Sequence, residues 1–288
     1  MQLLIKQIRS HLALSQTELA EKLGVTFATV NRWENGRAVP NKLAQTRIFE
    51  ICKERNVPLY QMVLEKIQKA AAEIPVDDKY ILLYHGSKSG ITGDIGLHSR
   101  RHCDFGKGFY MGTDPGQSLT LICDYPESKF YILSVDMTEL KSMEIPVNLD
   151  WAMLVAYNRD KMERIKGSAL YEKYHTMTAD NDLLIGCIAD DRMFFVIDNF
   201  FQGTITDAAL INSLSALQLG KQYVMVTQKG CDHTRIEAEI ELSHLERLSI
   251  QTVAVENRIR GISLANEICK KHRREGMYFD ELLEGAGG

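Results

Sequence analysis

Two short helices joined by a three-residue turn near the N-terminus constrain the fold of this chain more than any other feature. Ser15 stands just before an apolar-periodic stretch, and Glu18 follows three residues later. That spacing forms a capping box, which predicts a helix start at this point. Gly24 is placed to end the first helix in a left-handed cap. A second helix is expected over residues 27–34, directly after Val25 and Thr26. This strand-free stretch predicts a small helical bundle.

Two helices joined in this way form the helix-turn-helix pattern. The residues from Gln16 to Gly36 resemble the Cro/repressor-type family of DNA-binding domains, and the resemblance covers about residues 1–67. In this family the second helix enters the major groove, and the domains commonly bind double-stranded DNA as dimers. The resemblance implies base contacts by Thr26, Thr29, Asn31 and Arg32, and phosphate contacts by Gln16, Asn35 and Arg37. A bundle that serves only for dimerisation is the alternative.

The rest of the chain divides into a linker, a second domain and a C-terminal segment. Residues 68–78 run from an alanine-rich helix end into a proline and two acidic residues, so we expect the linker there. Strand-like and helix-like stretches alternate over residues 79–250, which predicts an α+β domain. Within it, two strands joined by an acidic turn are expected at 181–186 and 192–197. Residues 251–288 are expected to form a helix followed by an acidic, glycine-rich tail or docking segment.

A strand that ends in a polar motif opens the second domain. The apolar residues 80–84 lead into His85, Gly86 and Ser87, and a polar loop then leads to Phe109 and Tyr110. A glycine lets the backbone approach a ligand closely, and an aromatic ring offers a stacking face. These residues therefore predict a pocket for a flat polar ring.

The strand with His-Gly-Ser, followed by Gly-Lys-Gly-Phe-Tyr, resembles the ADP-ribosyltransferases of the diphtheria-toxin and poly-ADP-ribose-polymerase type. The resemblance covers roughly residues 79–250 and implies an α+β split-sheet fold that binds NAD⁺. The third signature residue of this family is a Glu on a later strand. In this chain Gln222 occupies that setting, within residues 221–227.

The resemblance also implies roles for individual residues. His85 would hold a hydroxyl of the adenosine ribose, Tyr110 would stack on the nicotinamide, and Gln222 would bond the nicotinamide-ribose 2′-hydroxyl. Further contacts to NAD⁺ would come from Gly86, Ser87, Phe109 and Tyr125. A glutamine can form hydrogen bonds but cannot act as a general base. The presence of Gln222 in place of the family's Glu leaves three outcomes open: substrate-assisted transfer, weak activity, or NAD⁺ binding without turnover.

A second source of a catalytic carboxylate is the alternating run Glu237, Glu239 and Glu241. The arginine-specific branch of these enzymes uses a Glu-x-Glu spacing. Its earlier Arg and Ser-Thr-Ser motifs are missing from the sequence, so a solvated strand face is the better interpretation.

Together the two resemblances imply an NAD⁺-dependent mono-ADP-ribosyltransferase fused to a DNA-binding domain. Such a fusion suggests a bacterial or phage effector of the toxin–antitoxin or defence type, or an autoregulated regulator. The acceptor of the ADP-ribose stays open among protein, DNA, RNA and small molecules. The alternative is a transcriptional regulator whose C-terminal domain binds NAD⁺ without catalysis.

Composition narrows the cellular setting. A net charge of −4 gives no overall sign of nucleic-acid binding, although a local basic face is compatible with it. The six cysteines lack CxxC pairing, which argues against zinc or a disulfide framework and fits a reducing cytoplasm. We expect no metal, since the Asp190-Asp191 pair reads as an acidic turn. No apolar run approaches the roughly 18 residues of a membrane span, and the N-terminus is unlike a signal peptide.

Overall fold

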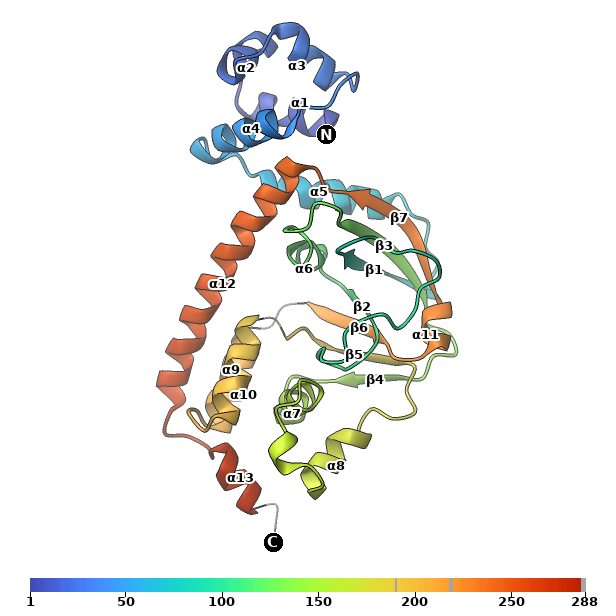
Figure 1. Cartoon of the computed structure of the whole chain (residues 1–288), viewed down its shortest axis with the longest axis vertical. Coiled ribbons are helices and arrows are strands. Elements are labelled where there is room, and N and C mark those ends of the chain that lie inside the picture. The colour runs from blue at the N-terminus through green and yellow to red at the C-terminus, as the bar shows by residue number, and fades with distance from the viewer. Residues whose placement is uncertain (190, 218–219, 286–288) are drawn as a thin grey trace.

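The computed structural model describes residues 1–189, 191–217 and 220–285. A helical bundle forms one end of the molecule and a mixed sheet with covering helices forms the other (Figure 1). The bundle contains α1 (Gln2–His11), α2 (Gln16–Leu23), α3 (Phe27–Glu34), α4 (Lys42–Glu54) and α5 (Leu59–Ala72).

The expected pair of short helices is present with the expected caps. The Ser15 hydroxyl accepts a hydrogen bond from the Glu18 amide, and the Glu18 carboxylate accepts one from the Ser15 amide at 2.7 Å. Gly24 ends α2 in the left-handed region, with φ of 67°. Thr26 then caps α3. Local sequence signals therefore account for this part of the fold.

The sheet has seven strands in the order β4-β5-β6-β2-β1-β3-β7. The strands are β1 (Tyr80–Ser87), β2 (Phe109–Gly112), β3 (Lys129–Asp136), β4 (Ser142–Ile145), β5 (Leu183–Cys187), β6 (Lys221–Met225) and β7 (Thr234–Glu241). The helices between and after them are α6 (Pro115–Thr120), α7 (Leu149–Asn158), the short 3₁₀ helix η1 (Glu163–Ile165), α8 (Ala169–Thr176), α9 (Asp191–Phe201), α10 (Asp207–Ala216), α11 (Gln228–Asp232), α12 (His244–His272) and α13 (Phe279–Gly285).

The sheet divides between β1 and β2. These two strands share one registered pair, Tyr84 with Gly112. On its other side β1 pairs with β3 along its whole length, from Tyr80 to Ser87. The sheet therefore consists of a β4-β5-β6-β2 half and a β1-β3-β7 half that part beyond Tyr84.

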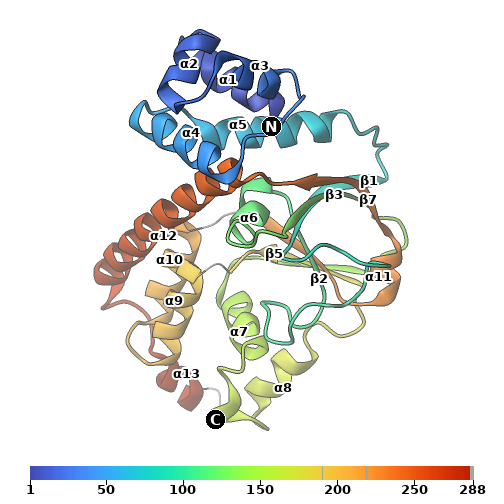
Figure 2. The same ribbon diagram turned by 45° about the horizontal axis from the view of Figure 1, so that its top comes forward.

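Both faces of the sheet are covered. The loop from residue 88 to 108 packs Ile91, Ile95 and Leu97 on one face. On the opposite face α5 and α6 cover the β1-β3-β7 half, and α7, α9 and α10 cover the other half. Figure 2 shows these helices beside the sheet from a second direction.

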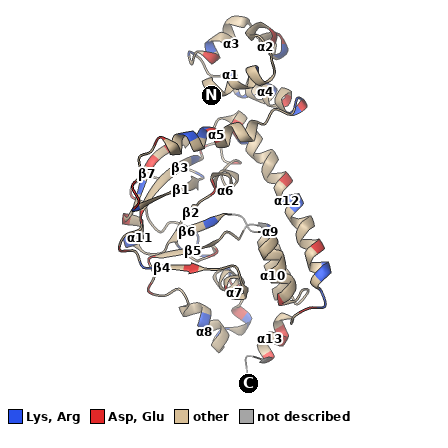
Figure 3. Cartoon of the chain, turned by 180° about the vertical axis from the view of Figure 1, so that it is seen from behind, with Lys and Arg blue, Asp and Glu red and all other residues tan. Residues whose placement is uncertain are grey.

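Helix α12 joins the two ends of the molecule (Figures 1 and 2). Leu245 near its start is fully buried in the core of the N-terminal bundle, and Ala265 is fully buried in the core beneath β5 and β6. The helix continues without a break across residue 250, where the sequence suggested a new segment. Charged residues of both signs lie along it (Figure 3). Helix α13 is docked on the sheet domain, because Phe279 is fully buried against Phe200 and Phe201.

The strand expected at residues 192–197 is wrong, because these residues belong to helix α9. Met193, Val196, Ile197 and Phe200 are all fully buried and recur at the spacing of one helix face. A short apolar run cannot by itself distinguish a buried strand from a buried helix. Asp190, in the expected acidic turn, lies outside the described residues.

In the described parts of the chain, no helix has both the length and the apolar character needed to cross a membrane.

Candidate functional site

The N-terminal bundle presents the predicted DNA-contacting residues on and around α3. Thr26, Arg32 and Arg37 are exposed, while Thr29 is half-buried. The Thr26 hydroxyl accepts from the Thr29 amide at 3.3 Å, so it also caps the helix. Arg32 and Arg37 place two positive charges at this surface, which suits a phosphate backbone.

The other three predicted residues form a chain of hydrogen bonds. Asn35 donates to Asn31 at 3.1 Å, Asn31 donates to Gln16 at 3.2 Å, and Gln16 donates to Glu34 at 2.7 Å. The sequence reasoning missed the end of this chain, where Arg9 pairs with the buried Glu34 at 2.6 Å. Burial acts to raise the pKa of Glu34, but the hydrogen bonds from Arg9 and Gln16 outweigh it and lower that pKa. This series of hydrogen bonds fixes the side chains that line the α2–α3 surface.

Phe27 is a further residue that the sequence reasoning missed. It is the first residue of α3 and its side chain is 51% exposed. An aromatic residue directly after the Thr26 cap is the sequence signal that could have identified it. Apolar side chains at this end of a recognition helix contact thymine methyl groups.

In the sheet domain, His85 lies where β1 and β2 part. Its Nδ1 donates to the backbone carbonyl of Tyr110 at 2.6 Å, since a carbonyl can only accept. The ring stacks on Phe109 with 4.6 Å between centroids. Burial lowers the pKa of His85 more than the bond to Tyr110 raises it, which favours the neutral imidazole. Its Nε2 then carries a lone pair, and no partner for it is found in the described residues.

Tyr110 uses its hydroxyl to hold its own loop. The hydroxyl donates to the Gly106 carbonyl at 2.7 Å and accepts from the Phe105 amide at 3.0 Å. Burial first, and then the nearby charge of Asp104, raise the pKa of Tyr110. Any contact to a ligand therefore falls to the ring.

Gln222 is buried and its amide is committed to the protein. Its Nε2 donates to Asp104 Oδ2 at 3.0 Å and to the Cys187 carbonyl at 2.8 Å. Asp104 is 6% exposed and also pairs with Arg159 and accepts from the Ala189 amide at 3.0 Å. The sequence reasoning missed this buried carboxylate. The only local signal was an acidic residue directly before the Phe105 turn.

The three motif residues occupy three neighbouring strands but two faces of the sheet. Gln222 is paired with Gly112, which is paired with Tyr84. Paired residues share a face and successive residues alternate, so His85 faces away from Gln222. Tyr110 lies two residues from Gly112 and shares the face of Gln222. The structure thus brings the backbone of Tyr110 to His85, but not the Gln222 amide.

The glycines and the serine of the motifs have structural partners. A Cβ on Gly86 would lie 2.5 Å from the Ser118 carbonyl of α6, so the close approach here is to a helix. A Cβ on Gly108 would lie 2.6 Å from Val224. The Ser87 hydroxyl donates to the Gly90 carbonyl at 2.9 Å. These contacts explain the residue types without a ligand.

The two aromatic candidates differ in their surroundings. Phe109 is buried and stacks on His85, so it supports that ring. Tyr125 is 39% exposed and follows α6. Its hydroxyl accepts from Lys88 Nζ at 2.7 Å, and the same ammonium lies 4.3 Å from the ring centroid. Lys88 therefore contacts both the hydroxyl and the ring of Tyr125.

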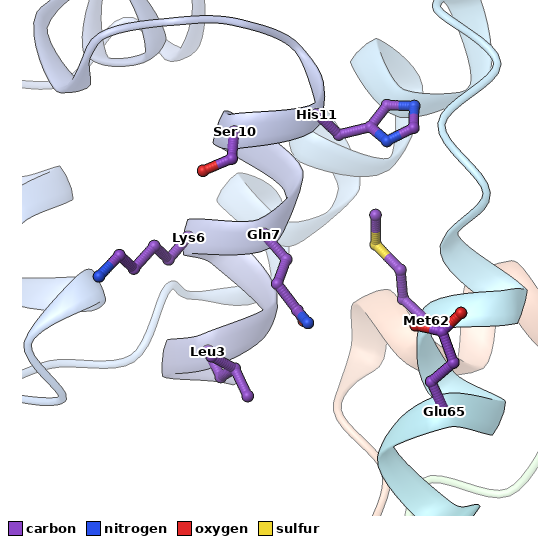
Figure 4. A pocket seen from close by; sticks show the side chains of 7 residues that line it. All are labelled: Leu3, Lys6, Gln7, Ser10, His11, Met62 and Glu65. Atoms are coloured by element: carbon purple, nitrogen blue, oxygen red, sulfur yellow. The ribbon is translucent and has the colours of Figure 1, made fainter.

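A shallow groove of about 540 Å³ lies between α1 and α5 (Figure 4). None of the residues predicted for DNA or NAD⁺ lines it. Its walls are formed by Leu3, Lys6, Gln7, Ser10, His11, Met62 and Glu65.

Comparison with known proteins supports the helical region first. The helix-turn-helix family matches residues 5–57. An "Uncharacterized transcriptional regulator in ATPase CF(0) region" from Rhodospirillum rubrum is 34% identical over 55 residues. That match covers 19% of this chain and 48% of the relative, so the chain spans about half the length of the curated relative. These findings support a DNA-binding regulator with a helix-turn-helix region.

No solved structure gives a significant match to this chain. The sheet domain is matched by the family described as "Protein of unknown function (DUF3990)", over residues 81–235. Because this match covers more than half of the 288 residues, the chain belongs to that family.

Proposed function

We propose that this chain is an NAD⁺-dependent mono-ADP-ribosyltransferase joined to a DNA-binding helix-turn-helix region. The reaction breaks the bond between nicotinamide and the ribose of NAD⁺ and joins the ribose carbon to an acceptor. Its transition state is oxocarbenium-like, so the protein must hold the ribose and orient the nicotinamide. The fusion to a helix-turn-helix region is consistent with an autoregulated effector.

The observation that carries the proposal is His85 at the division of the sheet. One ring nitrogen is bonded to Tyr110, and among the described residues the other has no partner; burial favours the neutral ring, on which that nitrogen is an acceptor. Such a nitrogen can accept a hydrogen bond from a ribose hydroxyl. The strands that carry His85, Tyr110 and Gln222 are neighbours in the sheet, in the order β1, β2 and β6.

A second candidate function is an NAD⁺-binding regulator without catalysis. Gln222 favours it, because its amide hydrogens already bond to Asp104 and Cys187. A neutral amide also places no negative charge beside an oxocarbenium ion. Asp104 supplies a carboxylate nearby, but Arg159 neutralises it.

The test uses purified full-length protein, labelled NAD⁺ and separate pools of cell protein, RNA and DNA. Wild type should transfer label to one pool, and His85→Ala should not. His233→Ala is the matched control, because that imidazole also lies 3.2 Å from a backbone carbonyl, at Asp136. Transfer that survives His85→Ala would contradict the proposal.

Calorimetry with NAD⁺ separates the two candidate functions. Binding without transfer would support the regulator that lacks catalysis. Absence of NAD⁺ binding by the wild type would remove both candidates and leave only the DNA-binding region.

A further inference from the structure

The segment from Ser99 to Gly108 is a closed and anchored loop. The Ser99 amide donates to the Gly108 carbonyl at 3.3 Å, and the Gly108 amide donates to the Ser99 hydroxyl at 2.9 Å. Inside the loop, Asp104 is held by Arg159, and Phe105 is buried in the core below. The base of the loop is therefore fixed, and the residues between the anchors project from a rigid support.

Three cations project from this loop, which we call the basic tip: Arg100, Arg101 and Lys107. All three side chains are exposed. Several other surface cations are paired with carboxylates, as Lys173 is with Asp150 at 2.6 Å. In the described part of the chain no carboxylate forms an ion pair with the basic tip. His102, between these cations, pairs with Asp160 at 2.7 Å. The tip is thus a local positive surface on a chain of net charge −4.

Aromatic rings lie beside the basic tip. Tyr157, at the end of α7, contacts Tyr171 of α8 with 5.1 Å between centroids, and its hydroxyl lies 2.6 Å from His175 Nδ1. These rings are half-buried or exposed. Asn158, directly after Tyr157, donates to the Asp104 carbonyl inside the anchored loop at 3.0 Å, so the end of α7 lies against the loop. Burial is the main cause that raises the pKa of Tyr157, and the charge of Arg101 acts against it.

We propose that the basic tip and the rings of Tyr157, Tyr171 and His175 bind single-stranded nucleic acid. Cations without carboxylate partners attract phosphates, and rings with an accessible face stack on unpaired bases. A duplex would hide the base faces that these rings could contact. An acidic peptide could use the cations but would leave the aromatic rings without partners.

If the proposed transferase function holds, on which this further step rests, the bound strand is the acceptor. The anchored loop ends at Gly108, two residues before Tyr110, so the strand would lie next to the candidate NAD⁺ site. A hydroxyl or ring nitrogen of the strand would attack the ribose carbon. Nicotinamide would leave with the electron pair of the broken bond, and the nucleophile would release its proton to water.

The binding test needs no NAD⁺ chemistry. Fluorescein-labelled 20-nucleotide oligo-uridine and oligo-thymidine are titrated with the full chain, and anisotropy is followed at several salt concentrations. All proteins carry Arg32→Ala and Arg37→Ala, which silence the helix-turn-helix surface. Arg101→Glu should weaken binding at least tenfold and reduce the salt slope by about 0.7 for each phosphate that the variant no longer neutralises. Arg235→Glu, an exposed arginine on β7, is the matched control.

Equal weakening by Arg101→Glu and Arg235→Glu would overturn the proposal, since it would reduce the effect to net charge. Tyr157→Leu should weaken binding by about tenfold if the rings stack on bases. Tighter binding of oligo-uridine or of oligo-thymidine shows whether the bound strand is RNA or DNA. An acidic peptide that binds as tightly as the oligonucleotides would contradict the assignment.

Calorimetry with NAD⁺ on the same variants distinguishes this proposal from the transferase proposal. Arg101→Glu should leave NAD⁺ affinity unchanged. A matching loss of NAD⁺ affinity would mean that the tip holds the pyrophosphate of NAD⁺, which overturns the nucleic-acid assignment. If the wild type binds the oligonucleotides but not NAD⁺, the nucleic-acid assignment of the basic tip stands. Only the transferase proposal is then removed.

Discussion

The helical bundle and the divided sheet hold their candidate residues in opposite ways. In the bundle Arg32 is exposed on the short capped helix α3, and Arg37 is exposed in the turn that follows it. In the sheet His85 and Gln222 are bonded to groups far along the chain, with Gln222 joined to Asp104 across 118 positions. A surface built from local helices is predictable residue by residue. A site built at a strand junction depends on partners that no local pattern indicates.

The largest expected effect tests whether the N-terminal bundle is stable without contacts from the distant helix α12. Leu245 is fully buried in its core although it comes from α12. The Gln45 side chain also accepts from the Leu245 amide at 2.9 Å. Leu245→Ala should lower the free energy of unfolding by about 4 kcal/mol, because it leaves a cavity. Urea denaturation of the full chain measures this loss, and hydrogen exchange should show weaker protection in α1 and α4.

Ile259→Ala is the control, since that side chain is 63% exposed on the same helix and should change stability by less than about 0.5 kcal/mol. Unchanged protection of α1 and α4 in Leu245→Ala would mean that the bundle does not need α12.

A smaller effect is expected for the buried carboxylate in the sheet domain. Asp104→Asn replaces one of the two carboxylate oxygens, which accept from Ala189, Gln222 and Arg159, with an amide donor and leaves Arg159 without its counter-charge. We expect a loss of about 2 to 3 kcal/mol in the free energy of unfolding. Thermal and urea denaturation measure it. Asp94→Asn, an exposed residue on the β1–β2 loop, should be neutral; equal effects of the two changes would remove Asp104 from its central place in the site.

The smallest effect concerns pH. Burial lowers the folded-state pKa of His85 below its ordinary 6.5. The unfolded chain therefore binds a proton more readily than the folded chain as pH falls below 6.5. This contribution to stability is full above 6.5 and is lost as pH falls toward the folded pKa. Urea denaturation between pH 7.5 and 5 should show that the free energy of unfolding of the wild type falls with pH. The fall should be shallower in His85→Gln.

His98→Gln removes an exposed imidazole from the β1–β2 loop and should keep the wild-type slope. A slope that is equally steep in His85→Gln would mean that the His85 ring is not held neutral by burial.

The sequence by itself determined the helix pair and its caps, and the helix-turn-helix match supports DNA binding by this region. Ser15, Glu18 and Gly24 each act on backbone groups a few positions away, so their effect does not depend on the rest of the fold. It also determined the strands that carry His85, Tyr110 and Gln222.

Only the tertiary structure decided what those residues contact. It placed His85 and Gln222 on opposite faces, joined Gln222 to Asp104, and turned residues 192–197 into a helix. It also set Leu245 in the core of a bundle formed by the first part of the chain. The physical reason is that burial and pairing are fixed by contacts between distant segments, and a local pattern of apolar residues is compatible with more than one such set of contacts.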